Sequence, residues 1–163
     1  MSSVSSDGGT RQRRRLTRAV KESLRELNNQ LSLLNHQVGA QVDLRDIDLD
    51  CLDLIARHGP LSPSALARRA GLHPATMTGI LDRLQRGGWI SRDRDPDATD
   101  RRAVAVRALS GRNADLFRIY SGMNSSMDQI CAGYTEAELE LVAGFLRRTT
   151  TAGHTATDEL AGD

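Results

Sequence analysis

Residues 61–109 constrain the fold of this chain more than any other stretch. A Ser-Pro pair at 62–63 predicts the start of a helix, because Ser caps free backbone amides and Pro suits the first helical position. Gly71 is expected to end that helix, and Pro74 to begin a second one that continues to about Arg86. The stretch therefore predicts two short helices joined by a tight turn.

The second of these helices has two distinct faces. Met77, Ile80, Leu81 and Leu84 recur at helical spacing and are expected to face the core. The opposite side carries small or hydrogen-bonding side chains, which permit close approach to a DNA major groove, and the helix N-terminus favours a phosphate. The alternative is a helical hairpin in an ordinary bundle. The candidate DNA-facing residues of the two helices are Ser62, Arg69, Pro74, Ala75, Thr76, Thr78, Gly79 and Arg83.

The segment that follows predicts a two-stranded hairpin with a charged tip. Trp89 and Ile90 begin the first strand, residues 103–106 form the return strand, and Pro and Asp residues between them favour a turn. Two helices followed by such a hairpin form a winged helix, whose tip can place an Arg in the minor groove. Acidic side chains in the loop would brace that Arg by bidentate pairing. The alternative is a solvated charged loop.

Apolar residues on either side of this stretch predict further helices. A seam of seven aliphatic side chains at spacings of 3 or 4 predicts one long helix that needs a partner from its own chain and from a second chain. The seam consists of Leu16, Val20, Leu24, Leu27, Leu31, Leu34 and Val38. A short helix over residues 47–58, one helix from Arg112 to about Ala132, and a last helix from Thr135 to near Thr149 complete the pattern. With only 3% aromatic residues, the expected fold is mostly α with a small β-hairpin wing.

Charge along the chain alternates in sign between four zones. Residues 1–25 carry a net charge of +5 and residues 62–107 a net charge of +4, whereas residues 26–61 and 108–163 carry −4 each. One face of the protein could therefore meet a polyanion. The first zone contains the cluster Arg11, Arg13, Arg14, Arg15 and Arg18, which is either a solvated helix start or an arm that touches phosphates. Residues 1–15 are expected to be a disordered basic arm and residues 151–163 a disordered tail.

Catalytic and metal-binding patterns are missing from the sequence. The four histidines and two cysteines show no metal-ligand spacing, and there is no phosphate-binding Gly-rich loop, so we expect no cofactor, no metal and no enzyme activity. The chain has no apolar run long enough for a membrane span and no secretory signal, so a cytoplasmic protein is expected. Whether Cys51 or Cys131 responds to oxidation is left open.

Several of these motifs together resemble the MarR family of bacterial winged helix-turn-helix transcriptional regulators. The matching motifs are LxxxxLA from Leu61, TxT at residues 76–78, DRLxxxGWIxR from Asp82, and DxxDRR from Asp97, followed by Leu-Ser at the end of the return strand. The resemblance covers about residues 16–150. It implies one domain over that range, with a DNA-binding lobe at residues 47–109 and dimerisation helices at residues 16–40 and 112–150.

The resemblance also implies a function and roles for wing residues. The family forms homodimers whose two winged lobes straddle a palindromic operator in double-stranded DNA, commonly as repressors relieved by a small-molecule effector. By the family's pattern, Arg102 resembles the Arg that enters the minor groove and Asp100 its brace, with Arg101 as an alternate and Arg94 nearby in the wing. The competing hypothesis is a winged-helix module that binds proteins and has no specific affinity for DNA.

Overall fold

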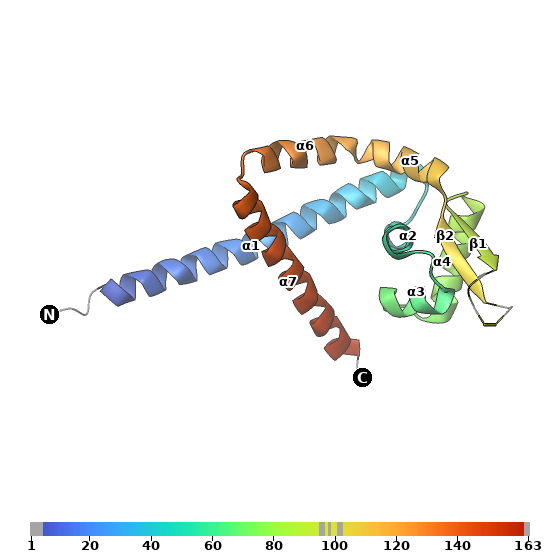
Figure 1. The fold of residues 1–163 in the computed structure, drawn as a ribbon, viewed down its shortest axis with the longest axis horizontal. Coiled ribbons are helices and arrows are strands. Elements are labelled where there is room, and N and C mark those ends of the chain that lie inside the picture. Colours follow the sequence, from blue (N-terminus) through green and yellow to red (C-terminus); the bar gives the residue numbers. More distant parts are fainter. Residues whose placement is uncertain (1–4, 95–96, 98, 101–102, 162–163) are drawn as a thin grey trace. The chain divides into compact units, whose positions relative to one another are not determined.

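A computed structural model describes residues 5–94, 97, 99–100 and 103–161 of the chain (Figure 1). Within these residues the fold is mostly α with a two-stranded antiparallel hairpin, which confirms the predicted fold class. Along the chain the elements are α1 (Ser5–Val42), α2 (Asp46–His58), α3 (Pro63–Ala70), α4 (Pro74–Arg86), β1 (Ile90–Arg94), β2 (Val104–Ala108), α5 (Ser110–Ile119), α6 (Ser121–Ala132) and α7 (Glu136–Ala161). None of the described helices is long and apolar enough to cross a membrane.

The chain divides into two compact units, and the boundary lies inside α2. The first unit ends at Leu49 and the second begins at Asp50. The second unit therefore contains most of α2 and all of α3, α4, the hairpin and α5 to α7. The predicted domain over residues 16–150 and the predicted lobe over residues 47–109 stay predictions.

The two short helices begin and end where their local sequence predicts. Ser62 caps α3 by accepting a hydrogen bond from the amide of Ala65 at 3.2 Å, and Pro63 occupies the first helical position. Gly71 ends α3 with a φ of 64°, a left-handed conformation that costs a residue without a Cβ little. Its amide satisfies carbonyl groups at the helix end, so α3 stops after Ala70 and the chain turns into α4.

The hairpin is part of a slightly larger antiparallel arrangement. β1 pairs with β2 in a register that runs from Ile90 opposite Ala108 to Arg94 opposite Val104. Leu61, just before α3, forms an isolated bridge to Val106, with N–O distances of 3.2 and 2.8 Å. These bonds join the entry of α3 to the return strand, so the helix pair and the wing share one framework.

A single aliphatic core holds this framework together. Side chains from α2, α3, α4 and the two strands are almost fully removed from water. Burial of one large apolar side chain stabilises the folded state by roughly 1.5–3 kcal/mol. The most deeply buried members are Leu52, Ile55, Leu66, Met77, Ile80, Leu81, Leu84, Trp89, Ile90 and Val106. The predicted inward face of the second short helix is therefore confirmed.

Both ends of the chain differ from their predicted disorder. Residues 5–15 are helical and continue directly into the predicted seam helix, because Arg and Gln are good helix formers once a helix has nucleated. Residues 151–161 continue α7, where Thr hydroxyls donate to carbonyl groups four residues earlier, as from Thr155 to Thr151 at 3.2 Å. The prediction of disorder was wrong there, because both polar segments continue helices that carry apolar residues along the rest of their length.

The predicted helix from Arg112 to Ala132 is two helices. α5 ends at Ile119 and α6 begins at Ser121, with Tyr120 as the residue between them. A capping box marks the start of α7: the amide and hydroxyl of Thr135 donate to Glu138, and the amide of Glu138 donates to the Thr135 hydroxyl. These hydrogen bonds hold the pKa of Glu138 below its ordinary value.

Candidate nucleic-acid interface

The outward face of α4 presents small and hydrogen-bonding groups to solvent. Pro74, Ala75, Thr76 and Thr78 are exposed and Gly79 is half-buried, while the inward side of the same helix is in the core. The Thr78 hydroxyl donates to the Pro74 carbonyl at 3.0 Å, so its oxygen can still accept a hydrogen bond. This face offers little steric bulk and several polar atoms, which is what close approach to base edges requires.

The start of α4 has fewer unoccupied amides than the sequence predicts. His73 Nδ1 accepts the Ala75 amide at 3.2 Å, and the Met77 amide donates to the His73 carbonyl at 3.1 Å. Pro74 has no amide hydrogen. Among the described residues, the Thr76 amide is therefore the one in this first turn that another protein group does not occupy. A phosphate here would meet that amide and the positive end of the helix dipole.

Arg83 lies one turn after Gly79 on the same side of α4. A Cβ placed on Gly79 would lie 3.7 Å from Nη1 of Arg83, so the guanidinium extends back along the helix toward the glycine. Arg83 is half-buried and takes part in further interactions of the protein. The absence of a side chain at Gly79 leaves room for this Arg beside the exposed face.

A cluster of polar side chains ties the wing to α4. Nη2 of Arg92, on β1, lies 2.6 Å from Oδ1 of Asp82, and its Nε lies 2.5 Å from Oε1 of Gln85. Asp82 on α4 is therefore engaged by the strand. The role of Arg92 could not be predicted from the sequence. Its partners lie on another element, and neither motif spacing nor hydrophobic periodicity indicates contacts between elements. The tie orients β1 against the helix that carries the candidate DNA contacts.

The base of the wing is fixed from its other side by Trp89 and α5. Trp89 is 1% exposed, and the guanidinium carbon of Arg112 lies 4.5 Å from the centroid of its ring, a cation–π contact. Nη1 of Arg112 also donates to the Gly87 carbonyl at 2.8 Å. Asn113 of α5 donates to the Leu109 carbonyl. These contacts hold both ends of the hairpin against α5 where the strands meet the core.

The wing tip contributes less to the described site than the sequence predicts. Arg94 is exposed at the end of β1, and Asp100 is exposed, with its carbonyl accepting the Ala103 amide at 3.0 Å. Arg101 and Arg102, the predicted minor-groove residues, lie outside the described residues. Ser62, the N-cap of α3, and Arg69, on α3, are both exposed, so the structure places both at the surface of the helix pair.

Three other observations bear on the chemistry of the described residues. Burial raises the pKa of the Tyr120 hydroxyl, and the carboxylates of Asp53 and Asp50 raise it further. Within the described part of the chain, no group of three or more His, Cys, Asp and Glu side chains could hold a metal ion. Cys51 is buried and Cys131 is partly exposed, and neither is in a disulfide.

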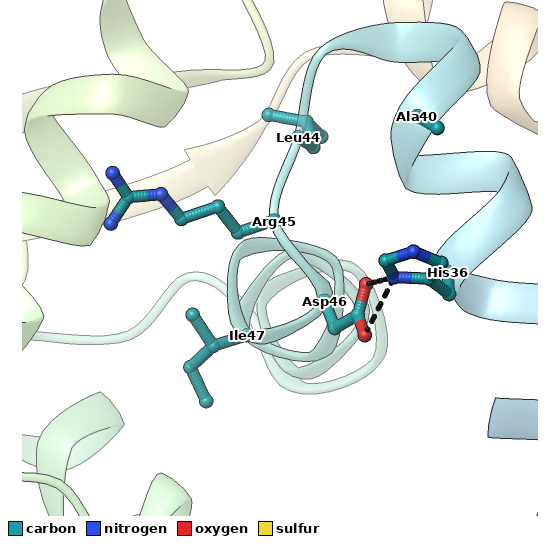
Figure 2. A pocket seen from close by; sticks show the side chains of 6 residues that line it. All are labelled: His36, Ala40, Leu44, Arg45, Asp46 and Ile47. Atoms are coloured by element: carbon teal, nitrogen blue, oxygen red, sulfur yellow. Dashed lines mark hydrogen bonds and ion pairs between the residues drawn. The ribbon is translucent and has the colours of Figure 1, made fainter. Parts of the chain in front are cut away.

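A pocket of about 490 Å³ lies where α1 turns into α2 (Figure 2). Its wall is largely apolar, from Ala40, Leu44 and Ile47, and His36 and Asp46 face each other at one side. Nδ1 of His36 lies 3.3 Å from Oδ1 of Asp46. The volume is in the range of sites for small organic molecules, with one polar pair to orient a ligand.

Comparisons with known proteins agree with the helix-turn-helix and wing described above. A model described as "MarR family" matches residues 48–104. YcgE of Bacillus subtilis, an uncharacterized HTH-type transcriptional regulator, is 32% identical over 110 residues, which cover 65% of this chain and 70% of that protein. A second B. subtilis protein of the same description, YfiV, is 33% identical over 67 residues, 41% of each chain.

Solved structures share the fold at lower identity. FabT of Streptococcus pneumoniae, solved in complex with DNA, has a TM-score of 0.65 at 19% identity, covering 86% of this chain and 99% of that one. A mutant of MepR from S. aureus has a TM-score of 0.68 at 18% identity, covering 82% and 96%. These similarities extend the shared fold beyond the residues that the family model matches.

Proposed function

The chain belongs to the MarR family of DNA-binding transcription regulators, and on that premise we propose that it is a homodimeric repressor. It would bind a palindromic operator through two winged lobes and release that operator when a small-molecule effector binds. The observation that carries the proposal is the exposed face of α4, whose side chains are mostly small or polar. Arg92 of the wing holds this helix in place through Asp82. The solved complex of FabT with DNA supports a nucleic-acid partner for this fold.

Exposed apolar side chains support a dimer. On α7, Leu141 is 69% exposed and Val142 45%, and on α1 Leu16 is 53% exposed. A monomer rarely leaves aliphatic side chains in water along two long helices. A second copy of the chain would cover these side chains. It would also set the distance between the two copies of α4, which must match half-sites about 34 Å apart.

An effector could act through that distance. Small changes in the orientation of the two lobes would remove the match to successive major grooves, because the groove spacing tolerates little error. The pocket between α1 and the start of α2 is one candidate site for such a molecule, since its apolar wall and its polar His36–Asp46 pair suit a small organic molecule.

The test is a fluorescence-anisotropy titration of the full chain with DNA from upstream of its own gene and with a scrambled duplex. We expect binding that weakens with salt and prefers the native DNA by about 10³-fold or more. Equal affinity for native and scrambled DNA, repeated with a genome-wide selection for preferred sites that yields none, would contradict the proposal and favour the protein-interaction module.

The wing assignment has its own prediction. Arg102→Ala should weaken binding to the selected operator by roughly tenfold, because one guanidinium in a narrow minor groove contributes on the order of 1–2 kcal/mol. Arg107→Ala, on the exposed side of β2, is the matched control and should change binding little. Retention of full affinity by the Arg102 variant, with an unchanged dimer mass, would remove Arg102 from the interface.

A further inference from the structure

α1 carries a positively charged surface that the proposed function does not use. Its cations recur at spacings of 3, 4, 3 and 4, so they form a stripe along one side of the helix. The stripe, called here the cationic stripe, consists of Arg11, Arg14, Arg18, Lys21 and Arg25. All five are exposed. The stripe is about 21 Å long at the rise of an α-helix.

The cationic stripe lies away from the apolar seam of the same helix. At 100° per residue, the centre of the stripe is rotated by roughly 140° from the centre of the seam that begins at Leu16. Packing of the seam against protein would therefore leave the stripe in solvent. Each face of α1 thus has a separate role available to it.

The stripe is electrostatically unbalanced. Residues 11–25 contain seven basic side chains and a single acidic one, Glu22. Arg14, Arg18, Lys21 and Arg25 form no ion pair with any described residue, whereas exposed arginines elsewhere do, as Arg57 does with Asp53 at 2.8 Å. Like charges one turn apart destabilise a helix by a few tenths of a kcal/mol per pair. A bound polyanion would offset this repulsion, because its negative charges attract the cations of the stripe.

A hollow on the stripe suits phosphate groups. Arg13, Arg14, Arg18 and Lys21, with Thr17, line an open depression of about 360 Å³. Guanidinium groups donate paired hydrogen bonds to phosphate oxygens, and the stripe is a straight row of them. Duplex DNA presents one negative charge per about 1.7 Å of its axis, so the stripe could face several phosphates at once.

We propose that the cationic stripe of α1 is a second, sequence-independent binding surface for the phosphate backbone of duplex DNA. It lies on a different helix from the α4 face and would add affinity without adding base readout. An anionic membrane is the weaker partner, because α1 contains no aromatic residue to anchor it at a lipid interface and its apolar seam is the face that a second segment of protein would cover.

The test compares salt dependence in full-length variants. R14Q/R18Q/K21Q/R25Q removes four charges while keeping good helix formers. We expect its binding to scrambled duplex to fall roughly tenfold at low salt, and the slope of log K against log salt to decrease in magnitude by about 2 to 4. Any preference for operator over scrambled DNA should be unchanged, because the stripe reads no bases.

Two matched variants keep the result interpretable. R57Q/R118Q/R147Q/R148Q removes the same charge from exposed positions outside the stripe and should retain the wild-type slope. R14K/R18K/R25K keeps the stripe's charge and should retain most of the affinity. Circular dichroism checks that every variant keeps its helix content.

Several outcomes would overturn the proposal. They are an unchanged slope in the stripe variant, an equal loss in the charge-matched control, or stripe-dependent binding to phosphatidylserine vesicles with no effect on DNA. Because the readout uses scrambled duplex, it does not depend on operator recognition. Loss of operator preference with an intact stripe effect would contradict the proposed function alone.

Discussion

Gly79→Glu is expected to weaken operator binding at least about a hundredfold while the protein stays folded. A Cβ at this position meets only Nη1 of Arg83, at 3.7 Å, so α4 can hold a side chain here without displacing the core. The new carboxylate would face the phosphates, where like charges cost several kcal/mol. It would also lie one turn before Arg83, an arrangement that favours an ion pair and would neutralise that Arg.

Two companion variants separate charge from bulk. Gly79→Ala should bind like the wild type and raise the free energy of unfolding by up to about 1 kcal/mol, since glycine is a poor residue inside a helix. Gly79→Gln has nearly the size of Glu without its charge and should lose much less affinity. Anisotropy titrations at fixed salt measure the binding. Wild-type affinity in the Glu variant would place α4 outside the DNA interface.

Trp89→Ala should produce the largest loss of stability among single substitutions at the wing. Its side chain is 1% exposed and lies under the guanidinium of Arg112, so truncation leaves a cavity and removes the cation–π contact. Truncation of a buried Trp costs about 3–5 kcal/mol. For a chain of this length that lowers Tm by on the order of 10 °C. The same change should loosen the base of the wing and reduce operator affinity.

The comparison variants for Trp89 share its surroundings. Trp89→Phe keeps an aromatic ring beneath Arg112 and should cost roughly 1–2 kcal/mol. Arg112→Ala removes both the ring contact and the hydrogen bond to the Gly87 carbonyl, and should cost about 1–2 kcal/mol. Thermal unfolding must be followed at one protomer concentration, since dimerisation would shift Tm. A Tm for Trp89→Ala near that of the wild type would contradict its assignment as the anchor of the wing.

Local sequence predicted the helix-turn-helix and the hairpin almost residue by residue. The Ser-Pro start, Gly71 and Pro74 mark ends of α3 and α4 because each acts through its own backbone, with no help from distant residues. The periodic aliphatic residues of α4 likewise predicted which side is buried, because helix geometry alone relates their spacing to one face. The family resemblance rests on these same segments.

Polar segments and contacts between elements were not predictable in this way. The helical residues 5–15 and 151–161 have no apolar periodicity, so the sequence offered no sign of helix there. The break at Tyr120 interrupts a run whose spacing favours one continuous helix.

The sequence by itself determined the helix ends, the buried face of α4, the hairpin and the two basic zones, because all of these depend on residues within a few positions of one another. Only the tertiary structure decided that Arg92 binds Asp82 and Gln85 and that Arg112 covers Trp89. Both contacts join segments on different elements, whose meeting depends on how the whole core packs.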